Sequence, residues 1–411
     1  MTSDRKWNGL TAVAALFAAS LLASTAALAD DPIKIGSIFD LTGDLNIYGI
    51  QQSRGLHLAV DKINADGGLL GRKVEIVESD AQSQQAKYTQ YANTLLMRDH
   101  VSALFAGLTS SAREAIRPIA RRAKVPYFYS SLYEGGACDK QTFITGPSAS
   151  QQLSVLIPWA IKTYGRRLFV MAPDYNFGTI SAEWIKRYAT DNKAEVVGSD
   201  ILPLTVTDYS PTIQKIQVAK PDVVVTLPVG ANQTGFLEQF AAAGLKSKIA
   251  LVSSNYGSGN QQIALSVDAA RGIVVSPEYV SSAPNPQNAA LKQAWRDKFG
   301  TTDPIIGPAI DVWNAAMLWA AAVKKAGSID EEKVIAALES GLTLDAPNGP
   351  ITLDARSHHL VQSIFIAKGN DTRDFDIVEA RDKVAPVFEQ KVCDLIAHPL
   401  LAKHFTGLDD F

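Results

Sequence analysis

The sequence predicts an α/β fold of two doubly wound, Rossmann-like lobes joined by a three-strand hinge, on the basis of three observations. Buried-type strands alternate with helical segments, which indicates a parallel sheet with helices on both faces. The alternation starts again in the middle of the chain, so two such sheets are expected. The length of 411 residues suits two domains, since a domain has about 100–200 residues.

The first block of elements begins with the apolar run 33–39, which reads as a fully buried strand. Helical spacing of apolar residues follows over 51–65 and stops at Asp66-Gly67-Gly68, because glycine accepts the left-handed turn that ends helices. The block continues with a strand at 74–77, a helix at 85–97, a strand at 101–105 and a helix at 112–123.

The second block contains the strands 168–171, 195–197, 223–226 and 249–252. Three polar or proline-rich stretches are candidates for crossings between the lobes, namely 145–150, 276–286 and 345–350. We therefore expect residues 30–148 and 278–343 to form lobe 1, and residues 149–277 and 344–411 to form lobe 2.

The N-terminus has the pattern of a secretory signal peptide over residues 1–29. Arg5 and Lys6 precede an apolar stretch over 9–23, and Ala27-Leu28-Ala29 provides the small residues of a cleavage site before Asp30. A membrane anchor is the alternative, but a span needs about 20 strongly apolar residues, and this stretch is mostly Ala, Ser and Thr. We expect an exported protein.

Charge and motifs exclude several classes of function. With 39 basic and 42 acidic residues the net charge is −3, which gives no basic surface for nucleic acid. The sequence has no Gly-x-Ser-x-Gly elbow, no phosphate loop and no His-Glu-x-x-His motif. We therefore expect neither an enzyme nor a bound cofactor.

Polar side chains gather where the predicted strands end, which is where open α/β sheets bind ligands. Ser110 and Ser111 could cap the helix that follows the strand 101–105, or could face a ligand. Tyr129, Ser131 and Tyr133 follow the next strand. The second block contributes Tyr175, Asn232 and Tyr256. Such a nearly neutral set suits a small neutral or singly charged molecule rather than a phosphate.

The two cysteines, Cys138 and Cys393, are expected to form a disulfide because an exported protein meets oxidising conditions. Free thiols are the alternative. Cys393 with His398 and His404 has a loosely metal-like spacing, but such patterns are permissive and we expect no metal site. The pair His358-His359 is assigned to a loop, since adjacent side chains on a strand point apart.

Several motifs resemble the periplasmic type I solute-binding proteins of ABC importers, in the leucine/amide/urea branch. The segments that carry the resemblance are Leu41-Thr42-Gly43, Tyr48-Gly49 and the run 63–72, and the similarity extends over residues 31–411. The resemblance implies two lobes that close like a Venus flytrap on a small-molecule ligand. It also implies a periplasmic location and ABC permease subunits of the inner membrane as partners.

In the amide and urea binders, a serine-rich helix start and a tyrosine-rich run contact the ligand. The resemblance carries these roles to Ser110, Ser131 and Tyr133, with Tyr129 beside them, and to Tyr175 in the second lobe. The stretch 345–350 with His358-His359 and the ending 408–411 also resemble this branch, which supports a structural role for the two histidines.

The sequence departs from the branch at informative places. Ser131 stands where threonine is usual, and 175–178 is nearer the amino-acid-binding pattern. The stretch 230–233, where amino-acid binders usually have an acid, is neutral. A buried ammonium without a partner is costly, so we expect a short-chain amide or urea. Asp174 or Asp44 could pair an ammonium instead, which keeps branched-chain or other hydrophobic amino acids and small aromatic acids as alternatives.

Three other classes of protein are less consistent with the sequence. A sensor that controls amide metabolism conflicts with the signal peptide, an exported hydrolase lacks a nucleophile–base pair, and an ectodomain lacks an anchor after the lobes. We expect an oxygen-rich end of the ligand to bind lobe 1, and lobe 2 to close over it. The residues expected to contact the ligand are Ser110, Ser111, Tyr129, Ser131, Tyr133, Tyr175, Asn232 and Tyr256.

Overall fold

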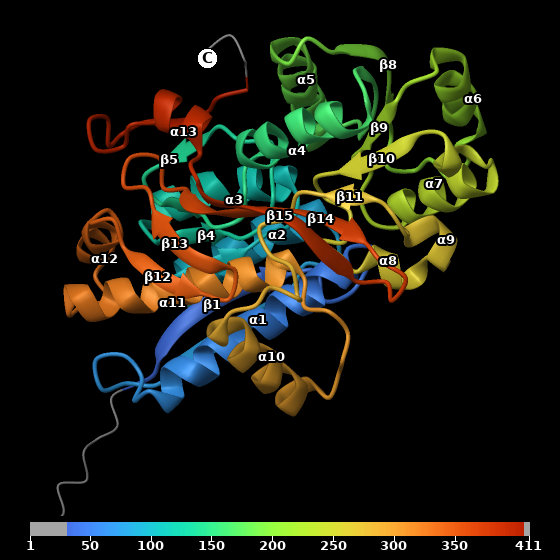
Figure 1. Ribbon diagram of the computed structural model, residues 1–411. Coiled ribbons are helices and arrows are strands. Elements are labelled where there is room, and N and C mark those ends of the chain that lie inside the picture. Colours follow the sequence, from blue (N-terminus) through green and yellow to red (C-terminus); the bar gives the residue numbers. More distant parts are fainter. Residues whose placement is uncertain (1–30, 407–411) are drawn as a thin grey trace, which may run out of the picture.

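The computed structural model describes residues 31–406 and has the two α/β lobes that the sequence predicts (Figure 1). The expected signal peptide, 1–29, and the ending 408–411 lie outside the described residues. Between residues 31 and 406, no helix has both the length and the apolar character needed to cross a bilayer.

The first lobe is built on a five-stranded parallel sheet in the order β2-β1-β3-β4-β6. Its strands are β1 (Ile33–Phe39), β2 (Val74–Asp80), β3 (Leu104–Ala106), β4 (Tyr127–Tyr129) and β6 (Thr142–Ile144). Strand β1 is apolar because both faces of the sheet are covered. Ile35 packs in one core, and Ile38 in the core on the opposite face.

Helices cover both faces of this first sheet (Figure 1). One face carries α1 (Asn46–Ala65), α10 (Pro286–Phe299), α11 (Gly307–Ala326) and α12 (Glu331–Leu338). The other face carries α2 (Gln85–Asn93), its π-helical continuation η1 (Thr94–Arg98) and α3 (Ser110–Ala123).

The second lobe continues the same principle in a nine-stranded sheet that also extends into the first lobe, and its parallel part has the order β11-β10-β9-β7-β8. Along β7, Phe169 and Met171 face one core while Leu168 and Val170 face the other. The strands are β7 (Arg167–Pro173), β8 (Glu195–Leu202), β9 (Val223–Thr226), β10 (Ala250–Ser253), β11 (Val274–Val275), β12 (Thr343–Ala346), β13 (Gly349–Leu353), β14 (Leu360–Gly369) and β15 (Phe375–Val384).

The helices of the second lobe again form two layers. Helices α4 (Ala149–Tyr164) and α5 (Asn176–Asp191) pack on one face. The other face carries α6 (Ser210–Ala219), α7 (Ala231–Ala242), η2 (Leu245–Ser247) and α9 (Val267–Ala270), with α8 (Gln261–Ala264) beside α7.

The chain crosses between the lobes at 145–148 and at 276–285. The stretch 345–350, which the sequence suggested as the third crossing, is instead the turn of the β12–β13 hairpin. Ala346 and Ile351 of this hairpin pack in the core of the first lobe, against α11. We therefore place the third crossing within β14, whose Leu360 belongs to the first-lobe core and whose Ile366 belongs to the second.

Both sheets reverse their strand order at equivalent points, between β1 and β3 in the first lobe and between β7 and β9 in the second. Ligands of open α/β sheets bind beyond the carboxyl ends of the strands at such a reversal. The loops that follow β1, β3, β7 and β9 are therefore the ones that the fold assigns to a binding site.

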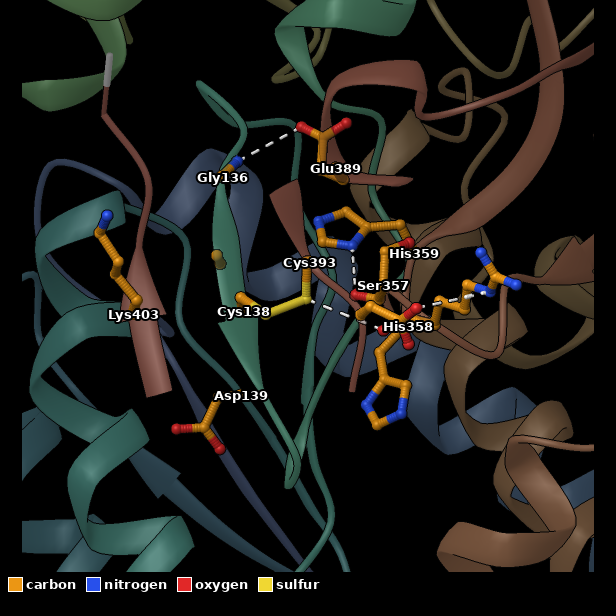
Figure 2. The surroundings of a disulfide bond; sticks show 12 residues. Gly136, Cys138, Asp139, Ser357, His358, His359, Glu389, Cys393 and Lys403 are labelled. Carbon is orange, nitrogen blue, oxygen red and sulfur yellow. Dashed lines mark hydrogen bonds and ion pairs between the residues drawn. A yellow bond between two sulfur atoms is a disulfide. The ribbon is translucent and has the colours of Figure 1, made fainter. Parts of the chain in front are cut away.

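The C-terminal segment returns to the first lobe and is tied there by a disulfide (Figure 2). It first forms α13 (Val387–Val392), whose Phe388 still packs in a core of the second lobe, and then β16 (Ala402–His404), which pairs with β5 (Ala137–Asp139) of the first lobe. Cys138 of β5 bonds Cys393, with the Cα atoms 5.7 Å apart. Both sulfur atoms are therefore used, and neither thiol is free to bind a metal.

We expect the double variant Cys138→Ser with Cys393→Ser to lose about 2–5 kcal/mol of unfolding free energy, because the bond closes a loop of 255 residues and so restricts the unfolded chain. Urea titration of the oxidised proteins measures the loss. The control is the wild type in reductant, which should match the variant. Equal stability of the oxidised wild type and the variant would contradict the prediction.

Candidate ligand-binding site

The loops at the carboxyl ends of both sheets enclose a cavity between the lobes, with a volume of about 30 Å³. This is room for about two water molecules, so a solute can enter only when the lobes separate. The lining residues are Tyr48, Leu108, Thr109, Ser110, Tyr129, Ser131, Leu132, Tyr175, Phe177, Val229, Asn255, Ser258 and Pro308. Among the residues that the structure describes, no charged side chain lines this cavity.

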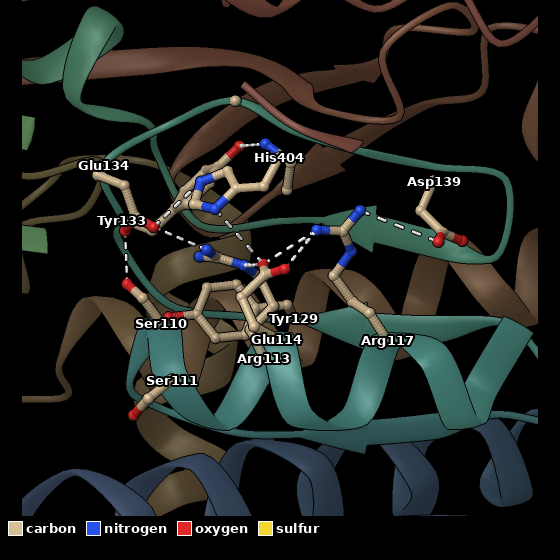
Figure 3. A network of polar contacts seen from close by, with 12 residues as sticks. Ser110, Ser111, Arg113, Glu114, Arg117, Tyr129, Tyr133, Glu134, Asp139 and His404 are labelled. Carbon is tan, nitrogen blue, oxygen red and sulfur yellow. Dashed lines mark hydrogen bonds and ion pairs between the residues drawn. The ribbon is translucent and has the colours of Figure 1, made fainter. Parts of the chain in front are cut away.

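Ser110 stands at the first turn of α3 and is oriented by a buried acid behind it (Figure 3). Its hydroxyl donates to Oε2 of Glu134 over 2.5 Å, while Oε1 of Glu134 receives a 2.7 Å bond from Nη2 of Arg113. An ion-paired carboxylate can only accept hydrogen bonds. The hydroxyl proton of Ser110 is therefore committed to Glu134, and the oxygen presents lone pairs to the cavity.

Arg113 anchors this network and is completely buried together with Glu134. Burial alone would lower the pKa of Arg113, but the charges of Glu134 and Glu114 outweigh it and hold that pKa well above its ordinary value. The guanidinium also packs against two rings that touch edge to face, 5.1 Å from the centre of Tyr129 and 4.6 Å from that of Tyr133. One cation thus fixes both the acid and the aromatic rings of the site.

The start of α3 supplies donors to the same cavity. Thr109 is the N-cap, and its side chain accepts from the N–H of Ala112. The alternative that Ser110 or Ser111 caps the helix is therefore wrong, since the helix begins at Ser110, two residues before the predicted start. The first N–H groups of a helix have no partner within it, so those of Ser110 and Ser111 point beyond the helix end.

The structure brings four of the eight expected residues together around the cavity, namely Ser110, Tyr129, Ser131 and Tyr175. Tyr256 lines an adjoining cavity instead. Ser111 is exposed and contacts Thr109. Tyr133 is buried behind Arg113, where its hydroxyl bonds His359. Asn232 turns away, because its amide donates to the carbonyl of Val206.

The second lobe closes the cavity with neutral groups. The amide of Asn255 donates to the carbonyls of Leu227 and Pro228, and its oxygen accepts from Ser253. Neither Asp44 nor Asp174 lines the cavity, although the sequence offered both as partners for an ammonium. Asn255 and Phe177 line the cavity but were not among the predicted contacts. Each lies within two residues of a predicted contact, Tyr256 or Tyr175, so their position after a strand end could have indicated them.

Tyr48, which the site prediction omitted, joins the two lobes across the cavity. It belongs to α1, yet its hydroxyl accepts hydrogen bonds from the N–H of Gly230 and from Nε2 of Gln261, at 3.0 and 2.7 Å. Its ring lies on Gly259, where a Cβ atom would come within 2.7 Å of it. With these two bonds accepted, the hydroxyl's own proton is directed at Ser258, whose hydroxyl donates to the carbonyl of Asn255 and can therefore accept.

The comparisons with known proteins agree with this architecture. Residues 32–374 match the family model described as periplasmic binding protein, so the chain belongs to that family. Within it, the chain is a type I periplasmic binding protein. The fold and family are those of the periplasmic solute-binding components of ABC transporters rather than of enzymes.

Individual relatives cover most of the chain. A Leu/Ile/Val-binding protein homolog of Brucella melitensis is 24% identical, over 85% of this chain and 91% of its own. A solute-binding protein from Rhodopseudomonas palustris, solved with 3,4-dihydroxybenzoic acid, is 25% identical with a TM-score of 0.78, covering 87% and 99% of the two chains. A Streptococcus pneumoniae protein solved with isoleucine is 22% identical, with a TM-score of 0.75 and coverage of 85% and 99%.

We expect Arg113→Met to lose about 3–5 kcal/mol of unfolding free energy, because it leaves the buried charge of Glu134 without its counter-charge. Urea unfolding measures the loss. The double variant with Glu134→Gln should recover part of it, since neither charge then remains unpaired. Losses that simply add in the double variant would contradict the assigned ion pair.

Proposed function

We propose that this chain captures a short-chain amide or urea-type solute by hinge closure and delivers it to the permease of an ABC importer. The observation that carries the proposal is the orientation of Ser110, whose hydroxyl donates to Glu134 and therefore accepts from the ligand. Tyr129 behaves alike, since its hydroxyl donates to the carbonyl of Leu108. An N–H group of the solute matches these two acceptors.

Hydrogen-bond donors at the same cavity match the carbonyl oxygen of an amide. The N–H groups at the start of α3 favour an oxygen with partial negative charge. The oxygen-rich end of the ligand, expected in lobe 1, then binds these N–H groups rather than the hydroxyl of Ser110. A primary amide or urea has both donor and acceptor groups and no net charge, which suits a cavity without charged side chains.

Hinge closure provides the coupling to transport. A ligand that contacts both lobes favours the closed form by its differential affinity for that form. Ser110 and Ser131 belong to the first lobe, and Tyr175 and Phe177 to the second. A solute held between these pairs stabilises closure, and the closed shape is what a permease can distinguish from the open one.

A small aromatic acid is the second candidate. Its support is the aromatic and apolar wall formed by Tyr175, Phe177 and Leu132, on which a ring could pack. The relative solved with 3,4-dihydroxybenzoic acid gives the same indication. A carboxylate, however, would face the accepting oxygen of Ser110 without a proton to offer it.

A thermal-shift panel of urea, short amides, branched-chain amino acids and small aromatic acids tests the proposal, followed by calorimetry on the ligands that raise Tm. We expect amides or urea to raise Tm. Ser131→Ala should weaken that binding about tenfold through one lost hydrogen bond, with unchanged Tm in the absence of ligand. A response confined to aromatic acids or to amino acids would overturn the amide assignment.

We expect Tyr48→Phe to shift the protein toward the open form, because Gly230 and Gln261 lose their shared acceptor across the cavity. Solute affinity should fall about tenfold, while each lobe keeps its stability. Small-angle scattering of the free protein measures the larger radius of gyration. Unchanged radius and affinity would show that the contact does not influence closure.

A further inference from the structure

A second cavity adjoins the ligand cavity on its hinge side and contains the carboxyl group of Glu278. Leu132 and Ser258 line both cavities, so the two spaces meet there. Glu278 follows β11 on the crossing 276–285, and it lines the second cavity although only 3% of the residue is exposed to solvent.

Glu278 has no basic partner. Within residues 31–406 its own backbone N–H is the one donor near the carboxylate, and no cation pairs with it. The carboxylate lies against the first residue of α11, where a Cβ atom on Gly307 would come within 1.8 Å of Oε1. This position therefore requires glycine, and the acid sits between the helix end and the cavity.

A second buried acid, Asp311, lies one turn further along α11, on the face that Gly307 begins. Neither of its oxygens has a hydrogen-bond partner among the described residues. Burial, and then the charge of Glu278, raise the pKa of Asp311 well above its ordinary value, and burial raises the pKa of Glu278 to about 7. Burial thus disfavours the ionised form of both acids, and a cation beside them would favour it.

We infer that the hinge-side cavity is a ligand subsite in which Glu278 binds a positively charged nitrogen group, of ammonium type, on the same solute. A charged donor and a buried carboxylate form the strongest class of hydrogen bond. The inference rests on the proposed function and narrows it to amides that also carry an amine, with the neutral cavity holding the amide and Glu278 holding the charge.

Another acid, Asp374, lines the same cavity and supplies a matched control. It is half-buried, and its Oδ1 already accepts from the backbone N–H of Phe375. Glu278 by contrast is buried and has no donor beyond its own backbone. The ligand's cation is therefore assigned to Glu278 and not to Asp374.

Calorimetry with valeramide and its ω-amino derivative tests the subsite in the wild type, Glu278→Gln and Asp374→Asn. We expect the amine to bind the wild type more tightly than valeramide does. Glu278→Gln should weaken the amine about 30-fold or more and leave valeramide unchanged, which also shows that the variant folds. Asp374→Asn should keep the preference. Equal losses for both probes, no loss in Glu278→Gln, or loss in Asp374→Asn alone would overturn the inference.

A second arm separates this inference from the amide assignment. Ethylammonium chloride should raise the Tm of the wild type but not of Glu278→Gln, relative to potassium chloride at equal ionic strength. If it does so while valeramide fails to bind, the amide assignment fails and the subsite stands. If valeramide binds but ethylammonium shifts both proteins equally, the subsite is overturned. An equal rise with potassium would indicate an inorganic cation site and would also overturn it.

Discussion

The buried ion pair of Arg113 and Glu134 is the interaction on which the rest of the site depends. It fixes the direction of the Ser110 hydroxyl, and its guanidinium packs against the rings of both Tyr129 and Tyr133. The acid also contacts His404, whose Nε2 lies 3.3 Å from Oε1, so the C-terminal segment completes the network. This ion pair does not line the cavity, yet it determines that the hydroxyl of Ser110 accepts hydrogen bonds from a ligand rather than donating them.

The charged side chains of the site lie behind the cavity, and the side chains that line the cavity are neutral. A buried ion pair contributes little net stability, but it imposes one geometry on its neighbours, and a hydroxyl with only one way to point selects ligands better than a freely rotating one. In the second lobe a neutral side chain is fixed in a similar way, because the amide of Asn255 donates to the carbonyls of Leu227 and Pro228. Both walls of the cavity are therefore preorganised before any solute arrives.

Sequence reasoning was strong where the signal is local and weak where it is not. Apolar runs such as 33–39 and the glycine stop at 66–68 correctly indicated the first sheet and its helices, and strand ends located four cavity residues. Tyr48 was missed because its partners, Gly230 and Gln261, are far away in the sequence. Asn232 was misplaced because the carbonyl of Val206, on a different loop, captures its amide. The direction of Ser110 likewise depends on an acid, Glu134, that lies in the loop between β4 and β5.

The disulfide has a consequence for how the protein is made. Cys138 lies in the first lobe, whereas Cys393 follows β15, the last strand of the second-lobe sheet. During synthesis the first cysteine is made alone, and its partner follows only after the strands of both sheets. With only two cysteines in the chain, no incorrect intramolecular pairing is available. Forming the native bond therefore requires oxidation but no exchange between alternative intramolecular disulfides.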